Sequence, residues 1–423
     1  MGQFLSSIIY QALGGLVAGP ALAWLTLKGR FGGRWADRLG FPLAGGGGPL
    51  WFHAASVGEA QSALTIMGAL ADNLKNVKFV LSVGTPAGLG RAQSLAPPRT
   101  QILAPPVDFW GAPSRALDRV GPRALIIVET ELWPELIRQA QRRDIPVLVT
   151  AGRMSQKSHQ RYQRAQALFR PLLASMPLVA VIGQADRARY LSLGARETQT
   201  EVVGNPKFDS LVLIARQSPR FSERSLGRKI LIAGSTEENE ESLIIDSWLL
   251  QAEKPHLILA PRHLGRLPGL LANLKERQLA YRLLSARPEL DWPNEPDLIV
   301  VDCLGALGQL YAQADLAIIG GSLFRGQGHN PLEPAAYGRP VLYGPHMTSF
   351  ATECRELESV GAARMVQPGD WPDALARWLA LGEAYLQGQA GRELLVRRPL
   401  VGPALAELIV QALGLRPTEA VAA

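Results

Sequence analysis

The sequence predicts an α/β protein built from two doubly wound parallel sheets. Short apolar, β-branched runs alternate with segments of helical periodicity almost throughout the chain. This alternation is typical of parallel sheets that are covered by helices on both faces. The chain has 423 residues, which is too long for one ordinary hydrophobic core and suggests two domains. Its composition, with 47% hydrophobic and 19% charged residues, is that of a globular protein.

Each half of the chain contains its own set of predicted strands. In the first half we expect strands at residues 50–54, 78–83, 124–128, 146–150, 178–182 and 201–203. In the second half we expect them at residues 229–233, 256–260, 297–301, 316–319 and 340–343. Residues 59–74 are an example of the helices between them, because their apolar side chains recur every three or four positions. Residues 204–225 lack clear periodicity, so we place the junction there, between a domain at 41–210 and a second at 211–423.

Residues 1–40 differ from the rest of the chain in composition, because an uncharged apolar run is followed by basic residues. No charged residue occurs between Gly2 and Leu27, a length that exceeds the about 20 apolar residues a helix needs to span a bilayer. Basic residues follow it: Lys28, Arg30, Arg34 and Arg38. By the positive-inside rule this flank stays in the cytoplasm, so we expect an N-terminal hydrophobic helix that anchors the protein. A helix lying in the membrane interface and a buried helix are the alternatives.

Charge and missing motifs exclude several classes of protein. A net charge of +7 and a pI near 9.6 favour anionic partners. Aromatic residues are not interleaved with the basic ones, which argues against binding of nucleic acid. The two cysteines provide neither a disulfide framework nor a metal-ligand pattern. The glycine motifs of dinucleotide oxidoreductases and P-loop NTPases are absent.

A glycine-rich segment that begins at Gly321 follows a predicted strand and opens into a helix. Asn330 is the expected N-cap, Pro331 the first helical residue and Glu333 the acid of a capping box. Backbone N–H groups at such a place favour a phosphate, and His329 lies beside them in the sequence. The segment therefore predicts a site for a phosphorylated ligand.

Three acids follow predicted strands in the first half. Glu59 begins a helix, where the dipole favours the ionised carboxylate that a general base requires, although a charge that only complements the dipole is an alternative. Glu129 and Glu131 follow residues 124–128 and are suited to orient a hydroxyl or a cation; acids in the first turn of a helix are the alternative. His53, in contrast, is expected to be a packed residue.

Polar residues follow the predicted strands of the second half as well. Ser235 or Thr236 is a natural N-cap and also suits a phosphate. Arg262 and His263 follow the next strand, and an arginine there is able to bind a phosphate bidentately, with a surface salt bridge as the alternative.

Segments spread over nearly the whole chain resemble the 3-deoxy-D-manno-octulosonic acid (Kdo) transferase family. These segments are residues 53–59, 129–134, 152–155, 204–209, 235–241, 261–263 and 320–345. The resemblance implies a GT-B fold, which has two Rossmann-like domains facing a cleft. It implies an inverting glycosyltransferase that moves Kdo from CMP-Kdo to the lipid A precursor (lipid IVA) in lipopolysaccharide synthesis. It further implies no metal at the active site, and contact with lipids on the cytoplasmic side of the cell inner membrane.

The resemblance also implies a role for each site residue. The expected catalytic residues are the base Glu59 and the paired acids Glu129 and Glu131, in the acceptor-binding domain at 41–210. The donor-binding residues are expected in the CMP-Kdo-binding domain at 211–423: Ser235, Thr236, Arg262, His263, Gly321, His329, Asn330 and Glu333. Glu237 departs from the family, which often has histidine at this position.

Two other functions compete with Kdo transfer. One is a GT-B transferase or epimerase that uses a UDP-sugar. The other is a membrane-anchored binding protein that retains the fold without catalysis, which the presence of Glu59 and of the glycine-rich segment argues against.

Overall fold

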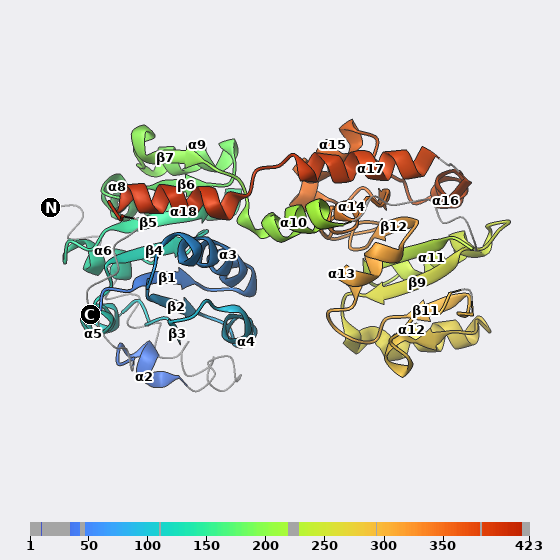
Figure 1. The fold of residues 1–423 in the computed structure, drawn as a ribbon, viewed down its shortest axis with the longest axis horizontal. Coiled ribbons are helices and arrows are strands. Elements are labelled where there is room, and N and C mark those ends of the chain that lie inside the picture. The colour runs from blue at the N-terminus through green and yellow to red at the C-terminus, as the bar shows by residue number, and fades with distance from the viewer. Residues whose placement is uncertain are drawn as a thin grey trace. The chain divides into compact units, whose positions relative to one another are not determined.

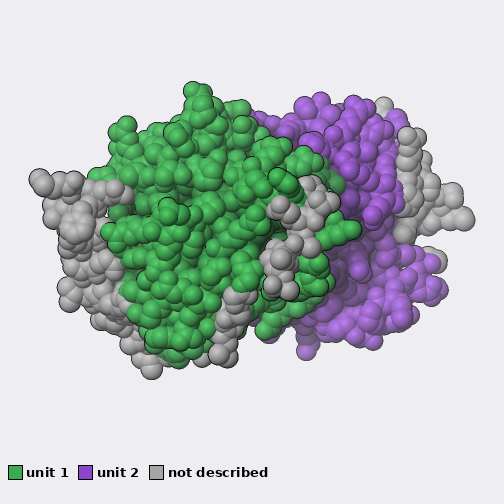
Figure 2. Space-filling view, turned by 60° about the vertical axis from the view of Figure 1, so that its left-hand side comes forward, with its two compact units in different colours: residues 1–209, 400–423 green, residues 210–399 purple. Residues whose placement is uncertain are grey.

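The chain folds into two compact units, coloured separately in Figure 2. The computed structural model describes Tyr10 and residues 34–42, 47–109, 111–218, 228–292, 294–380 and 383–416. Unit 1 contains residues 1–209 and 400–423, and unit 2 contains residues 210–399. All of 211–423 was predicted to belong to the second domain, whereas the structure groups residues 400–423 with the first. Apart from Tyr10, the predicted N-terminal hydrophobic helix lies outside the described residues.

Unit 1 contains one parallel sheet of seven strands in the order β3-β2-β1-β4-β5-β6-β7 (Figure 1). The strands are β1 (Leu50–Ala54), β2 (Phe79–Val83), β3 (Thr100–Leu103), β4 (Ala124–Val128), β5 (Val147–Gly152), β6 (Val179–Val181) and β7 (Thr200–Val202). The strand order reverses between β1 and β4, which pair in parallel. In a doubly wound sheet, ligands bind beyond the carboxyl ends of the strands at this reversal.

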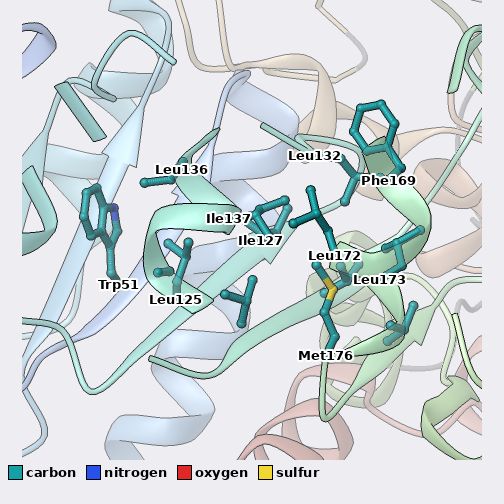
Figure 3. Close-up of a cluster of buried hydrophobic side chains, with 14 of the residues drawn as sticks. Trp51, Leu125, Ile127, Leu132, Leu136, Ile137, Phe169, Leu172, Leu173 and Met176 are labelled. Carbon is teal, nitrogen blue, oxygen red and sulfur yellow. The ribbon is translucent and has the colours of Figure 1, made fainter. Parts of the chain in front are cut away.

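Helices cover both faces of this sheet. They are α2 (Trp35–Arg38), α3 (Val57–Asn73), α4 (Pro86–Leu95), α5 (Ala112–Val120), α6 (Pro134–Gln141), α7 (Gln156–Arg164), α8 (Gln166–Ala174), α9 (Gln184–Leu193) and α18 (Val401–Ala412), with the 3-10 turns η1 (Glu197–Gln199) and η2 (Pro206–Phe208). Alternate strand residues point to opposite faces, as the two-residue period of a strand requires. Trp51, Leu125 and Ile127 point into the core under α6 and α8 that Figure 3 shows. Phe52 and Ile126 point into the core under α3 and α18.

The last helix of the chain belongs to unit 1. α18 packs against α3 (Figure 1). The side chain of Asp209 accepts hydrogen bonds from the Val401 and Gly402 N–H groups, at 3.0 and 2.6 Å. These N–H groups lie at the start of α18, where an acidic side chain satisfies donors that have no partner within the helix. Asp209 thus fixes the chain where it returns to unit 1.

Unit 2 has a second parallel sheet of seven strands, in the order β10-β11-β9-β8-β12-β13-β14. Its strands are β8 (Ile230–Thr236), β9 (His256–Pro261), β10 (Arg282–Leu283), β11 (Leu298–Val300), β12 (Leu316–Ile319), β13 (Val341–Tyr343) and β14 (Ala363–Met365). The order reverses between β8 and β12, so this sheet has a reversal equivalent to that of unit 1.

The helices of unit 2 complete the second Rossmann-like unit. They are α10 (Asp209–Gln217), whose first residue is the last of unit 1, α11 (Glu240–Leu249), α12 (Leu267–Glu276), α13 (Leu307–Leu310), α14 (Leu332–Ala336), α15 (Ala351–Ser359), α16 (Trp371–Ala380) and α17 (Glu383–Val396). The 3-10 turns are η3 (Leu264–Arg266), η4 (Leu284–Ala286), η5 (Tyr311–Gln313) and η6 (Thr348–Phe350). Leu231 and Leu259 point to one core of the sheet, and Ile230 and Ile258 to the other.

The predicted fold class is confirmed. Strands at 50–54, 124–128 and 316–319 have the bounds that the sequence analysis predicted, and the other predicted strands lie within a few residues of their expected positions. The strands β3, β10 and β14, which lie at sheet edges, were not predicted. Most of their residues are partly or fully exposed, so they lack the continuous apolar run of a central strand.

The part of the chain that the structure describes contains no helix both long and apolar enough to cross a membrane. Of the apolar segment predicted as an anchor, only Tyr10 is described. Its hydroxyl donates to the buried carboxylate of Asp108 at 2.9 Å, and its ring lies 5.1 Å from that of Phe109. The anchor stays a prediction.

Candidate active site

The predicted site residues lie at the reversal point of each sheet. In unit 1, Glu59 follows β1, and Glu129 and Glu131 follow β4. In unit 2, Ser235 and Thr236 end β8, and the segment from Gly321 follows β12. The topology places these loops where doubly wound sheets bind ligands. The structure thus brings the unit 1 residues to one end of their sheet and the unit 2 residues to one end of theirs.

Glu59 is held at the start of α3 by a capping box. Its carboxylate accepts hydrogen bonds from the N–H groups of Ala55 and Ser56, at 2.5 and 3.2 Å. The Ser56 hydroxyl accepts one from the Glu59 N–H at 3.2 Å. These contacts position the carboxylate and favour its ionised form.

Burial and neighbouring acids shift the pKa of Glu59 in the opposite direction, toward the protonated form. The residue is only 9% exposed. Its burial, and then the negative charges of Glu131 and Glu129, raise the pKa of the Glu59 carboxyl, against the effect of the two N–H groups. A carboxylate whose pKa is raised toward neutrality is a stronger base than an ordinary glutamate. The position therefore suits removal of a proton from an alcohol.

Glu129 lies in a strained backbone conformation and has an ion-pair partner. Its φ of +60° falls in the left-handed region, which non-glycine residues rarely adopt and which is common at functional sites. Its carboxylate accepts a hydrogen bond from Ser62 at 3.2 Å and forms an ion pair with Lys207. Its carbonyl oxygen accepts a hydrogen bond from the Tyr190 hydroxyl at 2.8 Å.

Glu131 is the second acid of the pair. Its carboxylate accepts a hydrogen bond from the Trp133 indole at 2.6 Å. Burial raises the pKa of Glu131 and the charge of Glu129 raises it further, against the Trp133 hydrogen bond and the charge of Arg161, which lower it. Three acids and one lysine are therefore clustered at the reversal point of unit 1, which can hold a hydroxyl and take up its proton.

Lys207 is the residue of this cluster to which the sequence analysis gave no role. It belongs to residues 204–209, one of the segments that resemble the family. Its one local signal is a lysine inside the predicted junction at 204–225. Because Glu129 lies far from it in sequence, only the fold shows that the two are paired.

Replacing Lys207 by methionine tests the electrostatic balance of this cluster. Without its cation, the charge of Glu129 acts on Glu59 uncompensated, so the pKa of Glu59 should rise further above its ordinary value. The acid limb of the pH–rate profile should then move to higher pH. Leaving Glu129 without its ion pair should also cost about 1–3 kcal/mol of stability. An acid limb at the wild-type pH would contradict the coupling.

His53 is a packed residue, as predicted. It is fully buried, its Nδ1 lies 2.9 Å from the Ser82 hydroxyl, and its ring lies 4.5 Å from that of Trp133. Its Nε2 is buried and has no hydrogen-bond partner among the residues that the structure describes. Burial lowers the pKa of His53 to about 3.

The buried histidine should make stability depend on pH. The unfolded chain binds a proton at His53 below about pH 6.5, whereas the folded chain resists protonation down to about pH 3. Stability should therefore fall as the pH drops below 6.5, by about 2 kcal/mol at pH 5. Urea unfolding of wild type and of His53→Gln at pH 7 and pH 5 measures this: the variant should lose about 2 kcal/mol less. Equal losses in the two proteins would refute the assignment.

In unit 2, β8 ends in a bulge at Ser235. The pairing register with β9 shifts between Gly234 and Thr236, and Ser235 has a φ of +57°. A Cβ atom on Gly320 would lie 2.3 Å from the Ser235 carbonyl oxygen, so only glycine allows β12 to end this close to the bulge.

The prediction that Ser235 or Thr236 caps the next helix is wrong. α11 begins at Glu240, after Asn239. The hydroxyl of Thr236 donates instead to the carboxylate of Glu241 at 2.9 Å, and Thr236 is fully buried. A phosphate-binding role for Ser235 and Thr236 stays a prediction.

Glu237 lies between two histidines of the predicted donor site. Its carboxylate is 3.6 Å from His263 Nε2 and 3.9 Å from His329 Nε2. Burial lowers the pKa of His329, the charge of Arg262 lowers it further, and Glu237 opposes this. Arg262 also lowers the pKa of Glu333, which burial raises. These couplings place Arg262, His263, His329 and Glu333 in one electrostatic cluster with Glu237.

The start of the glycine-rich segment differs from the prediction. The N–H groups of Gly321, Ser322 and Leu323 are not open to a phosphate, because all three donate to the buried carboxylate of Glu240. Glu240 was not predicted as part of the site, because nothing local in the sequence pairs it with residues about 80 positions later.

The helix after this segment begins one residue later than predicted. α14 starts at Leu332, and Pro331 occupies the N-cap position without a side-chain hydrogen bond to the helix. The side-chain oxygen of Asn330 still accepts a hydrogen bond from the Leu332 N–H, at 3.1 Å. The capping box predicted for Glu333 is not formed.

A cavity lies at the amino ends of β1, β2 and β4, and its lining residues include Leu50, Lys78 and Arg123. Ligands of this fold bind at the opposite end of the sheet, so we give the cavity no role in catalysis. Among the described residues, no group of three or more His, Cys, Asp or Glu side chains is arranged to hold a metal ion. The metal-free active site stays a prediction.

The fold and the two clusters define a protein of the GT-B class, a class of glycosyltransferases and epimerases. The Neisseria meningitidis UDP-GlcNAc 2-epimerase bound to UDP-GlcNAc has a TM-score of 0.58 at 12% identity and covers 87% of this chain and 100% of its own. An Anabaena protein in complex with UDP and glucose has a TM-score of 0.54 at 12% identity and covers 86% of this chain and 99% of its own. At this identity the likeness shows the fold alone.

Sequence relatives identify the family. The family model described as "3-Deoxy-D-manno-octulosonic-acid transferase (kdotransferase)" matches residues 33–210. The 3-deoxy-D-manno-octulosonic acid transferase of Haemophilus influenzae is 31% identical over 86% of this chain and 86% of its own length. That of Bordetella pertussis is 32% identical over 87% and 89%. The chain belongs to the Kdo transferase family and is a glycosyltransferase.

A third relative is longer than this chain. The bifunctional glycosyltransferase/methyltransferase of Fusobacterium nucleatum is 30% identical over 73% of this chain. The aligned part spans 49% of that relative, about half its length.

Proposed function

We propose that this chain transfers Kdo from CMP-Kdo to a lipid A precursor, lipid IVA, with inversion at the sugar. Kdo transfer in lipopolysaccharide synthesis follows from the family, and this favours it over a reaction with a UDP-sugar. The observation that carries the catalytic proposal is the cluster at the reversal point of unit 1. There, a positioned carboxylate with a raised pKa, Glu59, lies beside two further acids.

On the acceptor side, Glu59 removes the proton from the attacking hydroxyl. The capping box holds its carboxylate in place, and the raised pKa strengthens it as a base. Burial is the main cause of this raised pKa, the charges of Glu131 and Glu129 add to it, and Lys207 balances the charge of Glu129. The acids thus prepare the hydroxyl for attack.

On the donor side, the residues of unit 2 bind CMP-Kdo. Loss of CMP leaves positive charge on the sugar and adds negative charge to the phosphate. Arg262 provides positive charge for that phosphate, and the histidines at 263 and 329 provide N–H donors. We propose further contacts to CMP-Kdo from Ser235, Asn330 and Glu333, with Thr236 and Gly321 beside them. No step of this reaction requires a metal.

We further propose that the protein works at the cytoplasmic side of the cell inner membrane. Residues 1–40 combine an uncharged apolar segment with a basic flank, which suits an anchor next to acidic lipids. A phosphorylated glycolipid acceptor has its acyl chains in the same bilayer. Inner-membrane lipids are then partners of the N-terminal segment.

One experiment tests the reaction. The purified full-length chain is incubated with CMP-Kdo and lipid IVA, and the products are weighed by mass spectrometry. A mass gain of one or more Kdo units, with release of CMP, is the expected result. Transfer from a UDP-sugar, or no transfer with CMP-Kdo, would refute the proposal.

A further inference from the structure

The turn after β12 forms a nest of backbone N–H groups around a carboxylate. Gly321 has a φ of +66°, and the N–H groups of Gly321, Ser322 and Leu323 converge on Glu240 at 2.8, 2.9 and 2.8 Å. The Glu237 N–H donates to the same carboxylate at 2.8 Å. Four donors use the full acceptor capacity of one carboxylate, and Glu240 is only 1% exposed.

Such nests ordinarily bind anions. Successive N–H groups that point at one place form a concavity for phosphate or similar groups. Here the chain fills the concavity with its own anion, contributed by the first residue of α11. An external phosphate therefore finds neither free N–H groups nor a favourable field there.

The nest adjoins the predicted donor residues. A Cβ atom on Gly321 would lie 2.9 Å from His329 Cδ2 and 3.0 Å from His329 Nε2, so the ring lies against the nest backbone. Glu237, whose N–H belongs to the nest, has its carboxylate 3.9 Å from the same His329 nitrogen. A donor phosphate at His329 thus has the filled nest as its neighbour.

We propose that Glu240 is a specificity-determining residue that restricts the donor to a nucleotide with a single phosphate. CMP-Kdo has one phosphate between nucleoside and sugar, whereas UDP-sugars have two. A second phosphate placed beside the nest meets the negative charge of Glu240 and no free donor. This inference rests on the proposed function, because it takes His329 as a donor-phosphate contact.

A purely structural role for Glu240 predicts a different result. If Glu240 only holds the turn, its loss should weaken CMP and CDP binding by the same factor. If it excludes a second phosphate, its loss should change the ratio of the two affinities. The ratio is therefore the measurement that distinguishes the two roles.

Calorimetric titration of the full-length chain with CMP and with CDP, in a buffer with a metal chelator, measures this ratio. Wild type should bind CDP about tenfold more weakly than CMP, since like charges brought together oppose binding. In Glu240→Gln, which removes the charge at nearly constant volume, the ratio should shift toward CDP by about tenfold. CDP binding tighter than CMP binding in wild type, or an unchanged ratio in the variant, would overturn the inference.

Glu241→Gln is the matched control. Glu241 is the next residue of α11 and is also buried, but its carboxylate binds Thr236 and Arg266 instead of the nest. Its variant should keep the wild-type ratio. If Glu240→Gln does not fold, the wild-type protein still tests the inference, because CDP that binds as tightly as CMP overturns it. Failure of CMP to bind wild type would overturn the proposed donor and this inference with it, whereas CMP binding with an unchanged ratio overturns the inference only.

Discussion

Replacing Glu59 by glutamine should lower Kdo transfer by at least about 100-fold while CMP-Kdo still binds. The amide has nearly the shape of the carboxylate, and its oxygen can still accept a hydrogen bond from the Ala55 N–H, but it cannot take up the proton of the acceptor hydroxyl. The wild-type rate should fall as the pH drops through the raised pKa of Glu59, because protonation disables the base. That acid limb should lie above the pH range of an ordinary glutamate.

Ser56→Ala separates catalysis from helix capping. It removes the reciprocal half of the capping box but leaves the Glu59 carboxylate in place. It should cost about 1 kcal/mol of stability and only a small part of the activity. Glu59→Gln with near-normal turnover, or equal losses of activity in the two variants, would rule out Glu59 as the base.

Replacing Arg262 by alanine should chiefly weaken CMP binding, by about 10- to 100-fold, the range expected when hydrogen bonds to a charged phosphate are lost. Arg262 lies at the end of β9, close enough to act on the pKa of both His329 and Glu333. Its side chain has no structural ion pair in the part of unit 2 that the structure describes. Calorimetry with CMP measures the effect directly.

Arg277→Ala is the control for the loss of one positive charge. Arg277 pairs with Asp246 at the surface of unit 2, at the end of α12, and contacts none of the predicted donor residues. It should leave CMP affinity within about twofold of wild type, as expected for a screened surface charge. An Arg262→Ala protein that binds CMP as tightly as this control would remove Arg262 from the donor site.

The buried strands were predictable because local composition determines them. A strand covered on both faces by helices is a continuous apolar run, as residues 124–128 show, so it stands out from one sequence alone. The edge strands β3, β10 and β14 were missed because they are short and partly exposed, and they form only through pairing with a neighbour. α18 could be expected as a helix, but not as part of unit 1, because its partner Asp209 is 192 residues away.

The predicted helix starts show the same limit. Ser56 and Glu59 lie three residues apart, so their capping box is a local feature. Thr236 was an equally good cap by sequence, yet its hydroxyl donates to Glu241 and α11 starts later. A local rule cannot foresee a side chain whose best partner lies elsewhere in the fold.

The sequence by itself determined the fold class, the family and the strand ends at which Glu59, Glu129 and Arg262 lie, because apolar runs and short motifs are local properties. The tertiary structure decided the pairing of Glu129 with Lys207, the occupation of the Gly321 N–H groups by Glu240 and the return of α18 to unit 1. These depend on buried charges and donors finding partners far along the chain, since a buried polar group without a partner is costly. Only the folded chain shows which partners they find.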